Sequence, residues 1–305
     1  MATKKITLGY RQEYPEGKFI EKTKEATVVS AYYEMPSKHS INNYKEWIRL
    51  FLESIPCYLV FFTEEPYREF IEDCRRNYKD KTHIIILDRS LWKANKFEDK
   101  YWKNQQIKDD ERELHKSIDL YKIWYEKKEF VKRAIELNPF NHEDFVWTDA
   151  GFIGRRSELI SLVKEYPKAN RIPTNRILML NYWPFSLKDN TIKNDIMGGG
   201  SGRPRIQGAI IAGHKDMWKK YDILYDKMIE KYNKADLFTG KDQTIMASIT
   251  LENRDFISLL ELKPISPESW FYLVLWLGVN DNLYSVFSSN KTNTIKKTYK
   301  ELALI

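Results

Sequence analysis

Cysteine is scarce in this sequence, and a long apolar run is missing. The 305 residues contain two cysteines, Cys57 and Cys74, in strand-like and helix-like surroundings. Two thiols alone form neither a zinc centre nor a disulfide framework, which favours a reducing compartment. No window approaches the roughly 18 apolar residues of a membrane-spanning helix, and no apolar segment follows Met1 as in a signal peptide. We therefore expect a soluble protein in the cytoplasm, or in the host cytoplasm if the gene is viral.

A block of one charge is missing as well. The chain has 50 Lys and Arg against 43 Asp and Glu, interleaved along its length, so the net charge of +7 is spread out. A protein that binds nucleic acid stably usually clusters its cations. Neither a stable nucleic-acid complex nor a membrane span is expected, whereas a small anion such as a nucleoside diphosphate needs only a few cations. Hydrophobic residues make up 42 %, which provides a sizeable core and excludes a disordered chain.

Strands and helices alternate in the first part of the chain. Apolar, β-branched runs at residues 26–33, 58–63 and 83–88 predict buried strands, and helical spacing of apolar residues predicts helices at 44–55 and 66–77. Strand, helix, strand, helix, strand within so short a stretch is typical of a nucleotide-binding half-sheet. The chain shows no internal repeat and no clear linker. We therefore predict a single α/β domain, with a mixed, mostly parallel central sheet flanked by helices.

The remaining segments follow the same logic. Periodicity fails over residues 90–115, which predicts irregular structure, and a long amphipathic helix follows until Asn138-Pro139 ends it. Further helices are predicted at 156–165 and 218–232, and strands at 177–181, 206–213 and 257–262. The predicted parts of the domain are a peripheral segment (1–24), a nucleotide-binding half (25–150), an acceptor-side half (151–265) and a C-terminal extension (266–305).

The middle of the chain holds the most suggestive acid. The apolar run Phe145–Trp147 continues into Thr148 and ends at Asp149, and Gly151 follows, as expected for a buried strand that emerges into a sharp turn. Open α/β sheets bind ligands at the carboxyl ends of their strands. The alternative is a carboxylate that only caps the turn.

Several other side chains are candidates for ligand binding, and each has a structural alternative. Ala31 and Tyr32 end the first strand and could receive a nucleotide base, although a core tyrosine fits equally well. Asp88 ends the third strand and could contact ribose or cap a turn. Lys127, on the long helix, could reach phosphates or lie in solvent.

The second half of the chain adds further candidates. Gly208 and Gly213 lie in a predicted strand, where glycine often marks close approach of a ligand, and His214 either acts there or starts a helix. Asp242 with Gln243 could reach a reacting centre, or Asp242 could cap the following helix. A glycine-rich run at 198–202 is either a lid or a flexible connector, and it lacks the Gly-Lys-Ser/Thr ending of a P-loop.

Three motifs together resemble one known family. The segments 120–127, 138–140 and 145–151, in that order, are similar to the HtrL/YibB-like family, a group regarded as glycosyltransferases that occurs in bacteria and large DNA viruses. The early strand at residues 28–33 and the Gly-Lys-Asp-Gln at 240–243 fit the same series, so the resemblance covers roughly residues 26–262. It implies a GT-A type fold, a nucleotide-sugar donor and, as cofactor, Mn²⁺ or Mg²⁺.

The resemblance also implies roles for the candidates. Asp149 would hold the metal without a companion, because Trp147 stands where most GT-A enzymes have the first acid of an Asp-X-Asp motif. Asp242 would be catalytic, as a base or as a stabiliser of the anomeric centre. The remaining assignments fall into two groups. Expected to bind the sugar donor are Ala31, Tyr32, Asp88, Lys127, Asp149 and Gln243. Expected on the acceptor side are Gly208, Gly213 and His214.

The leading hypothesis is therefore an enzyme that moves a sugar from a UDP- or GDP-sugar to a glycan or other carbohydrate acceptor. The competing hypothesis is a non-catalytic basic module that binds nucleic acid or acidic polysaccharide, suggested by the net charge and by 9 tryptophans and 19 tyrosines. Most of these aromatics fall on apolar helix faces or in strands, which favours packing in the core.

Overall fold

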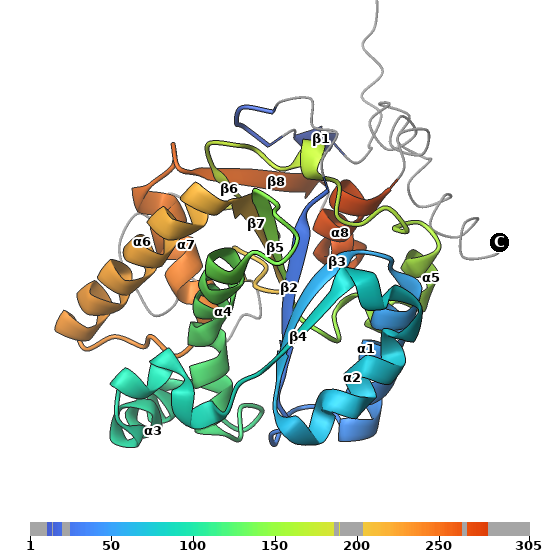
Figure 1. Ribbon diagram of the computed structural model, residues 1–305. Helices are drawn as coiled ribbons and strands as arrows, with labels where there is room; N and C mark the ends of the chain where they lie inside the picture. The colour runs from blue at the N-terminus through green and yellow to red at the C-terminus, as the bar shows by residue number, and fades with distance from the viewer. Residues whose placement is uncertain are drawn as a thin grey trace, which may run out of the picture.

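An eight-stranded mixed sheet runs through the centre of the molecule, in the order β1-β8-β6-β7-β5-β2-β3-β4 (Figure 1). The structure is a computed structural model that describes residues 11–13, 15–19, 25–185, 189, 204–263 and 267–279. The glycine-rich run at 198–202 therefore lies outside the described residues, as do most of the N-terminal segment and residues 280–305.

Four neighbouring strands form a parallel half-sheet. They are β5 (Asp144–Thr148), β2 (Thr27–Tyr32), β3 (Tyr58–Thr63) and β4 (Thr82–Ile86), in that spatial order. Every residue of β2 and β5 is buried, as their apolar, β-branched composition requires for strands covered on both faces. Because the four strands run the same way, their carboxyl ends meet at one edge of the sheet.

The other half of the sheet is mixed. Strand β7 (Ile210–His214) runs antiparallel to both β5 and β6 (Ile177–Asn181). Strand β8 (Ile257–Lys263) is parallel to β6, and the short β1 (Arg11–Glu13) pairs with β8. The reversal at β7 brings the start of that strand beside the end of β5.

Helices cover both faces of the sheet, and each face has its own apolar core (Figure 1). One face carries α1 (Ile41–Ser54), α2 (Arg68–Cys74), α5 (Ser157–Ile160) and α8 (Tyr272–Gly278). The other carries α3 (Asp99–Lys108), α4 (Ile118–Leu137), α6 (Lys215–Lys234) and α7 (Asp242–Glu252). Short 3₁₀ turns join these elements: η1 (Glu65–Tyr67), η2 (Arg76–Lys81), η3 (Arg89–Leu91), η4 (Lys93–Lys96), η5 (Ile153–Arg155), η6 (Ala169–Arg171) and η9 (Pro267–Phe271). Within the described part, four of the seven strand pairs are parallel, so the predicted fold class is confirmed.

Local signals explain where the long helix α4 begins and ends. The hydroxyl of Ser117 accepts a hydrogen bond from the amide of Asp119 and caps the first turn. At the other end Asn138 has φ 38°, the left-handed conformation that closes many helices, and Pro139 cannot continue the helix. The end predicted from Asn138-Pro139 is therefore confirmed.

The structure departs from the predicted elements in several places. Residues 99–108 form α3 inside the stretch predicted to be irregular, because Trp102 and Gln105 are buried anchors hidden among charged residues. The helix predicted at 156–165 shortens to α5. Residues 271–279 are buried in the core of one face and belong to the stretch predicted as a C-terminal extension.

The two cysteines and the missing long apolar run can be compared with the structure. Both cysteines are free and buried, in the structural settings expected of them. In the described ranges, every helix is too short or too polar to cross a bilayer.

Candidate functional site

A buried lysine joins two carboxylates at the edge where the parallel strands end. The ammonium nitrogen of Lys127 lies 3.0 Å from Oδ1 of Asp149 and 2.8 Å from Oδ2 of Asp242. It also donates a hydrogen bond to the carbonyl oxygen of Gly208, at 2.9 Å. We call these residues, Lys127, Asp149, Gly208 and Asp242, the Lys127 cluster.

Four different elements build the Lys127 cluster. Asp149 follows β5, and its amide donates to the carbonyl of Ala209 beside the start of β7. Lys127 comes from the middle of α4, and Asp242 is the first residue of α7. A Cβ at Gly208 would lie 3.0 Å from Oδ2 of Asp242, so a side chain there would press on this carboxylate. The backbone before β7 can therefore approach the two acids closely.

The electrostatics of the cluster follow from burial and pairing. Lys127 is 6 % exposed. Burial alone would lower its pKa, but the charges of Asp149 and Asp242 outweigh that effect and raise it, so the lysine stays charged. For Asp149, which is only partly buried, desolvation by the surrounding protein is the largest cause and raises the pKa, as does the Asp242 charge, whereas the Lys127 charge opposes both. Two carboxylates and one ammonium leave the cluster with a net negative charge when all three are ionised.

An apolar cavity of about 160 Å³ opens next to the cluster, with Lys127 and Asp149 in its wall. Its remaining walls are mainly aromatic and aliphatic side chains from β2, α1, α4 and β5: Tyr32, Tyr33, Met35, Ile41, Tyr44, Leu120, Ile123, Trp124 and Trp147. The side chain of Asp149 is 40 % exposed, which leaves part of its carboxylate open to a ligand. Burial raises the pKa of Tyr32 to about 12, so its hydroxyl remains a hydrogen-bond donor at neutral pH. The cavity thus has an apolar body and a charged end.

Tight backbone packing supports this part of the site. Gly154 follows the Asp149 turn, and a Cβ at this position would lie 1.9 Å from the carbonyl oxygen of Trp47 in α1. A second support is Arg89, which donates to both carboxylate oxygens of Glu64, to Asp119 at 2.9 Å and to the carbonyl of Glu34. It joins the ends of β2 and β3 to the start of α4, so the rim of the site is held by charged hydrogen bonds.

Most of the candidates from the sequence come together here. Ala31, Tyr32, Lys127 and Asp149 line the cavity. Asp242 belongs to the Lys127 cluster, and Gln243 lies beside Gly208 and donates to the carbonyl of Ile206 at 2.7 Å. The α7 helix starts at Asp242, whose Oδ1 accepts from the adjacent amide of Gln243 at 2.8 Å, but the capping position is Lys241 and no described side chain caps the helix, so the catalytic role of Asp242 stays a prediction.

Three candidates lie apart from the cluster. Asp88 is exposed and caps a turn, accepting from the amide of Ser90 at 2.8 Å, which is the structural alternative for this residue. Gly213 pairs with Phe145 and His214 with Asp144, at the beginning of β5 and the opposite edge of the sheet from Asp149. His214 caps α6, as the structural alternative predicts. The antiparallel direction of β7 separates both residues from Gly208.

Two contributors were missed by the sequence interpretation. Tyr44 and Trp124 line the cavity, and they appear in the sequence as ordinary apolar-face residues of amphipathic helices. Trp147 was noted only for replacing an acid, yet its indole N–H donates to Oδ1 of Asp149 at 2.8 Å. Its position two residues before Asp149 on a strand was a usable signal, because such residues share one face.

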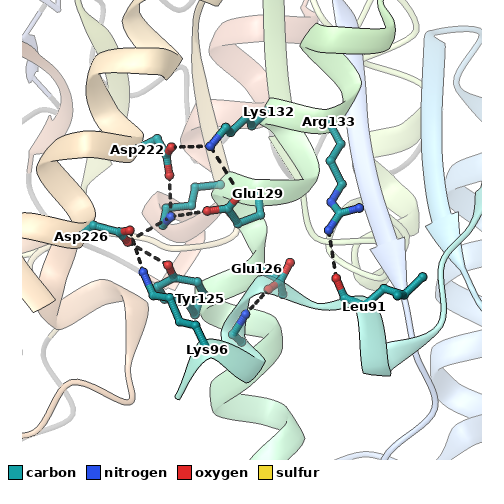
Figure 2. Close-up of polar contacts among 11 residues, drawn as sticks. Leu91, Lys96, Tyr125, Glu126, Glu129, Lys132, Arg133, Asp222 and Asp226 are labelled. Carbon is teal, nitrogen blue, oxygen red and sulfur yellow. Dashed lines mark hydrogen bonds and ion pairs between the residues drawn. The ribbon is translucent and has the colours of Figure 1, made fainter. Parts of the chain in front are cut away.

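The helix that carries Lys127 buries four consecutive charged residues, Glu126 to Glu129. Lys128 pairs with Glu129 and, across to α6, with Asp222 and Asp226, at 2.7, 2.5 and 3.1 Å (Figure 2). Such a ring of partners offsets the cost of burying the ammonium group. These ion pairs connect α4 to α6, and they hold the part of α4 that carries Lys127 in place.

Glu126 is the exception, because no cation in the described part of the chain pairs with it directly. It is fully buried, and Oε1 accepts from the amide of Ala94, while Oε2 has no hydrogen-bond partner among the described residues (Figure 2). Burial, with a contribution from Glu129, raises its pKa from 4.5 to about 7 against the weaker pull of Arg133 and Lys128. The folded protein therefore holds a proton that the unfolded chain releases at lower pH.

Glu126→Gln is expected to increase stability at high pH. Because the native state binds the extra proton, wild-type stability falls as pH rises from about 4.5 to about 7. The neutral glutamine avoids that loss, so its free energy of unfolding should exceed that of wild type by up to about 3 kcal/mol at pH 8 and match it near pH 4. Urea unfolding at both pH values measures this difference. Glu129→Gln is the control and should lose stability at pH 8, because it removes a partner of Lys128; a less stable Glu126→Gln protein at pH 8 contradicts the prediction.

The fit of a divalent metal can be judged from the same residues. Over the described ranges, no three His, Cys, Asp or Glu side chains gather to form a metal site. Oδ1 of Asp149 is engaged by Trp147 and Lys127, and no described residue donates to Oδ2. Mg²⁺ is often held by one or two carboxylates together with substrate phosphates. One free carboxylate oxygen at the cavity fits that mode, and a cage made by the protein alone does not.

Comparisons with solved structures return low-identity matches. Mouse xyloside xylosyltransferase 1, in its apo form, is 12 % identical, with a TM-score of 0.42 over 76 % of this chain and 84 % of that one. Core-mannan synthase A from Aspergillus fumigatus, in a Mn/GDP form, is 9 % identical, with a TM-score of 0.45 over 81 % and 79 %. The 4-diphosphocytidyl-2C-methyl-D-erythritol synthase of Anaerococcus prevotii is 12 % identical, with a TM-score of 0.37 over 83 % and 96 %.

A comparison with curated proteins finds no significant sequence match. The family comparison is more informative, because one family's sequence profile spans most of the chain. That profile is described as a bacterial protein of unknown function, HtrL_YibB, and it matches residues 24–274. The resemblance seen in the three sequence motifs is thereby confirmed, and the chain belongs to the HtrL_YibB family.

Proposed function

We propose that the protein is a glycosyltransferase of the GT-A type, which moves a sugar from a nucleoside diphosphate to a carbohydrate acceptor. The observation that carries the proposal is the buried ammonium of Lys127 between Asp149 and Asp242, beside an aromatic cavity. A nucleotide sugar has a flat apolar base, a diphosphate and a hydroxyl-rich sugar. The site offers a partner for each of these parts, and it lies at the carboxyl edge of a parallel half-sheet, where such folds bind nucleotides.

The sugar donor would lie along the cavity. Tyr32 and Tyr44 supply ring faces for the base, and the backbone at Ala31 borders the same space. The diphosphate then points to the charged end, where Lys127 is the cation among the described residues that line the cavity. A UDP- or GDP-sugar is the expected donor class.

The reaction breaks the bond between the anomeric carbon and the phosphate oxygen, and the electron pair leaves with the diphosphate. Lys127 stabilises that growing negative charge from a fixed position, without reorganisation. Asp242, 4 % exposed and next to the glycine backbone at 208, stabilises positive charge at the anomeric carbon or accepts the proton of the acceptor hydroxyl. The new bond joins that hydroxyl oxygen to the anomeric carbon. Gly208 and Gln243 form the adjoining wall on the side of the transferred sugar.

A divalent cation is part of the proposal. Oδ2 of Asp149, together with phosphate oxygens of the bound donor, would hold Mn²⁺ or Mg²⁺. When bound, the cation adds positive charge beside the leaving diphosphate. The roles of the protein residues do not change: Lys127 holds the carboxylates of Asp149 and Asp242 in position, and the aromatic side chains of the cavity exclude water from the base.

The competing function, a basic module that binds polyanions, has weaker support. Of the aromatic side chains, Trp102, Trp147, Tyr121, Tyr166, Tyr221 and Tyr232 are almost completely buried. Many cations, including the lysines of α4, are paired with acids. Binding to heparin or single-stranded DNA that is lost steeply as salt rises would favour this competing function.

A thermal-shift screen tests the proposed function. Nucleoside diphosphates and their sugars are added to wild-type protein, with and without Mn²⁺. A ligand at 100 times its Kd stabilises the native state by about 2.7 kcal/mol, so one base should raise Tm by several degrees. Mn²⁺ should enlarge that shift. An unchanged Tm with every nucleotide, in both conditions, would count against the proposal.

A further inference from the structure

Trp147 occupies an unusual position for a residue of its size and polarity. It is 2 % exposed and stacks on Phe130, with ring centroids 5.9 Å apart and an angle of 11° between the planes. Its indole nitrogen is nevertheless satisfied, because it donates to Oδ1 of Asp149 at 2.8 Å. The ammonium of Lys127 lies 5.9 Å from the ring centroid. A rigid buried ring thus ends at the carboxylate of the candidate site.

This contact restricts what the Asp149 side chain can do. Oδ1 is held by the indole and by the Lys127 ammonium, so the carboxylate cannot rotate without breaking both contacts. No described residue donates a hydrogen bond to Oδ2, and 40 % of the side chain, which lines the cavity, remains exposed. An indole is a donor only and keeps no charge at neutral pH. It therefore orients Asp149 without adding a charge to the cluster.

We infer that Trp147 is a positioning residue, whose indole N–H fixes Asp149 with one carboxylate oxygen presented to the diphosphate end of the sugar donor. The expected effect of Trp147 on catalysis rests on the proposed function. The orientation of Asp149 itself concerns only contacts within the chain and can be tested separately.

The first test is a double-mutant cycle that needs no activity. Trp147→Phe keeps an aromatic ring in the core and removes the N–H, and Asp149→Ala removes the carboxylate that accepts from it. A hydrogen bond to a carboxylate should make the two substitutions non-additive. If the two substitutions were independent, the factors by which they raise the unfolding equilibrium constant would multiply. The equilibrium constant of the double variant should be about tenfold smaller than this product predicts.

The chain offers a matched control in Trp218. This residue is 3 % exposed, and its indole N–H donates to the carbonyl of Phe145 at 3.0 Å, at the other end of the same strand. Trp218→Phe also removes a buried indole hydrogen bond, so it reproduces the general cost of the substitution. Its cycle with Asp149→Ala should be additive. An additive Trp147 cycle, or equal coupling for both tryptophans, overturns the inference.

The second test measures transfer from the nucleotide sugar that stabilises wild-type protein. Loss of a group that orients a ligating carboxylate typically costs 10- to 100-fold, so kcat/KM should fall by at least about tenfold in Trp147→Phe and stay near wild type in Trp218→Phe. Equal kcat/KM in the two variants overturns the positioning role. If wild-type protein transfers no sugar from any nucleotide, the proposed function fails, and the double-mutant cycle still decides whether Trp147 fixes Asp149.

Discussion

Lys127→Met is expected to destabilise the protein by about 3–5 kcal/mol at pH 8 and to abolish binding of the sugar donor. The substitution keeps the aliphatic length of the side chain but leaves Asp149 and Asp242 facing each other without the cation between them. Like charges at this range raise the pKa of a carboxyl group in the folded state above its value in the unfolded chain. The folded variant therefore binds more protons, and its stability should recover as the pH falls from 8 to 5. Urea unfolding across this range measures both effects.

Lys122→Met provides the control on the same helix. Lys122 pairs with Asp99 at 2.7 Å, but the Asp99 side chain is 63 % exposed, so water can replace the lost partner. This variant should lose no more than about 1 kcal/mol and show little change with pH. Equal losses of stability in the two variants would contradict this prediction. They would mean that the contacts of Lys127 stabilise the fold no more than the solvent-accessible ion pair of Lys122 does.

Asp149→Asn should reduce kcat/KM for sugar transfer by about 10²- to 10³-fold while the fold is kept. Asparagine has the same shape, and its carbonyl oxygen can still accept the hydrogen bond from Trp147. The Lys127 ammonium also keeps Asp242 as a partner. What is lost is the negative charge at the cavity, and with it the proposed ligand for the divalent cation. Transfer from a radiolabelled nucleotide sugar measures the effect.

Asp88→Asn is the matched comparison for this prediction. Asp88 also follows a parallel strand, but it is exposed and caps a turn outside the cavity. Its amide variant should transfer sugar at nearly the wild-type rate. Full activity in Asp149→Asn would remove Asp149 from the reaction, and equal loss in both variants would point to a general effect of strand-end substitutions.

Much of the fold was accessible from the sequence because several strands carry unbroken apolar runs. The stretches predicted at 177–181 and 58–63 match β6 and β3 at both ends. Prediction failed where burial depends on a few residues within a charged or mixed stretch. Helix α3 is anchored by Trp102 and Gln105, and no periodic pattern marks it. The strand predicted from residue 206 begins only at Ile210, because its first residues turn beside the Lys127 cluster.

The site was partly predictable for a different reason. Asp149, Lys127 and Asp242 were candidates from strand ends, helix position and family resemblance, and the structure joins them in one cluster. The burial of Lys127 could not be predicted, because the run Glu126–Glu129 is typical of a solvated helix face. His214 was misleading because strand direction decides which edge a residue reaches. Since β7 runs antiparallel to β5, His214 lies at the edge opposite Asp149.

The most direct test of the proposed site is a crystal structure of the wild-type chain with a nucleoside diphosphate and Mn²⁺. We expect the base to lie among Tyr32, Tyr44 and Trp124, and the diphosphate within hydrogen-bonding distance of the Lys127 ammonium. The cation should contact Oδ2 of Asp149. A nucleotide bound elsewhere, for example in the polar cavity near Tyr58 and Lys81 at the opposite end of the strands, would contradict the account.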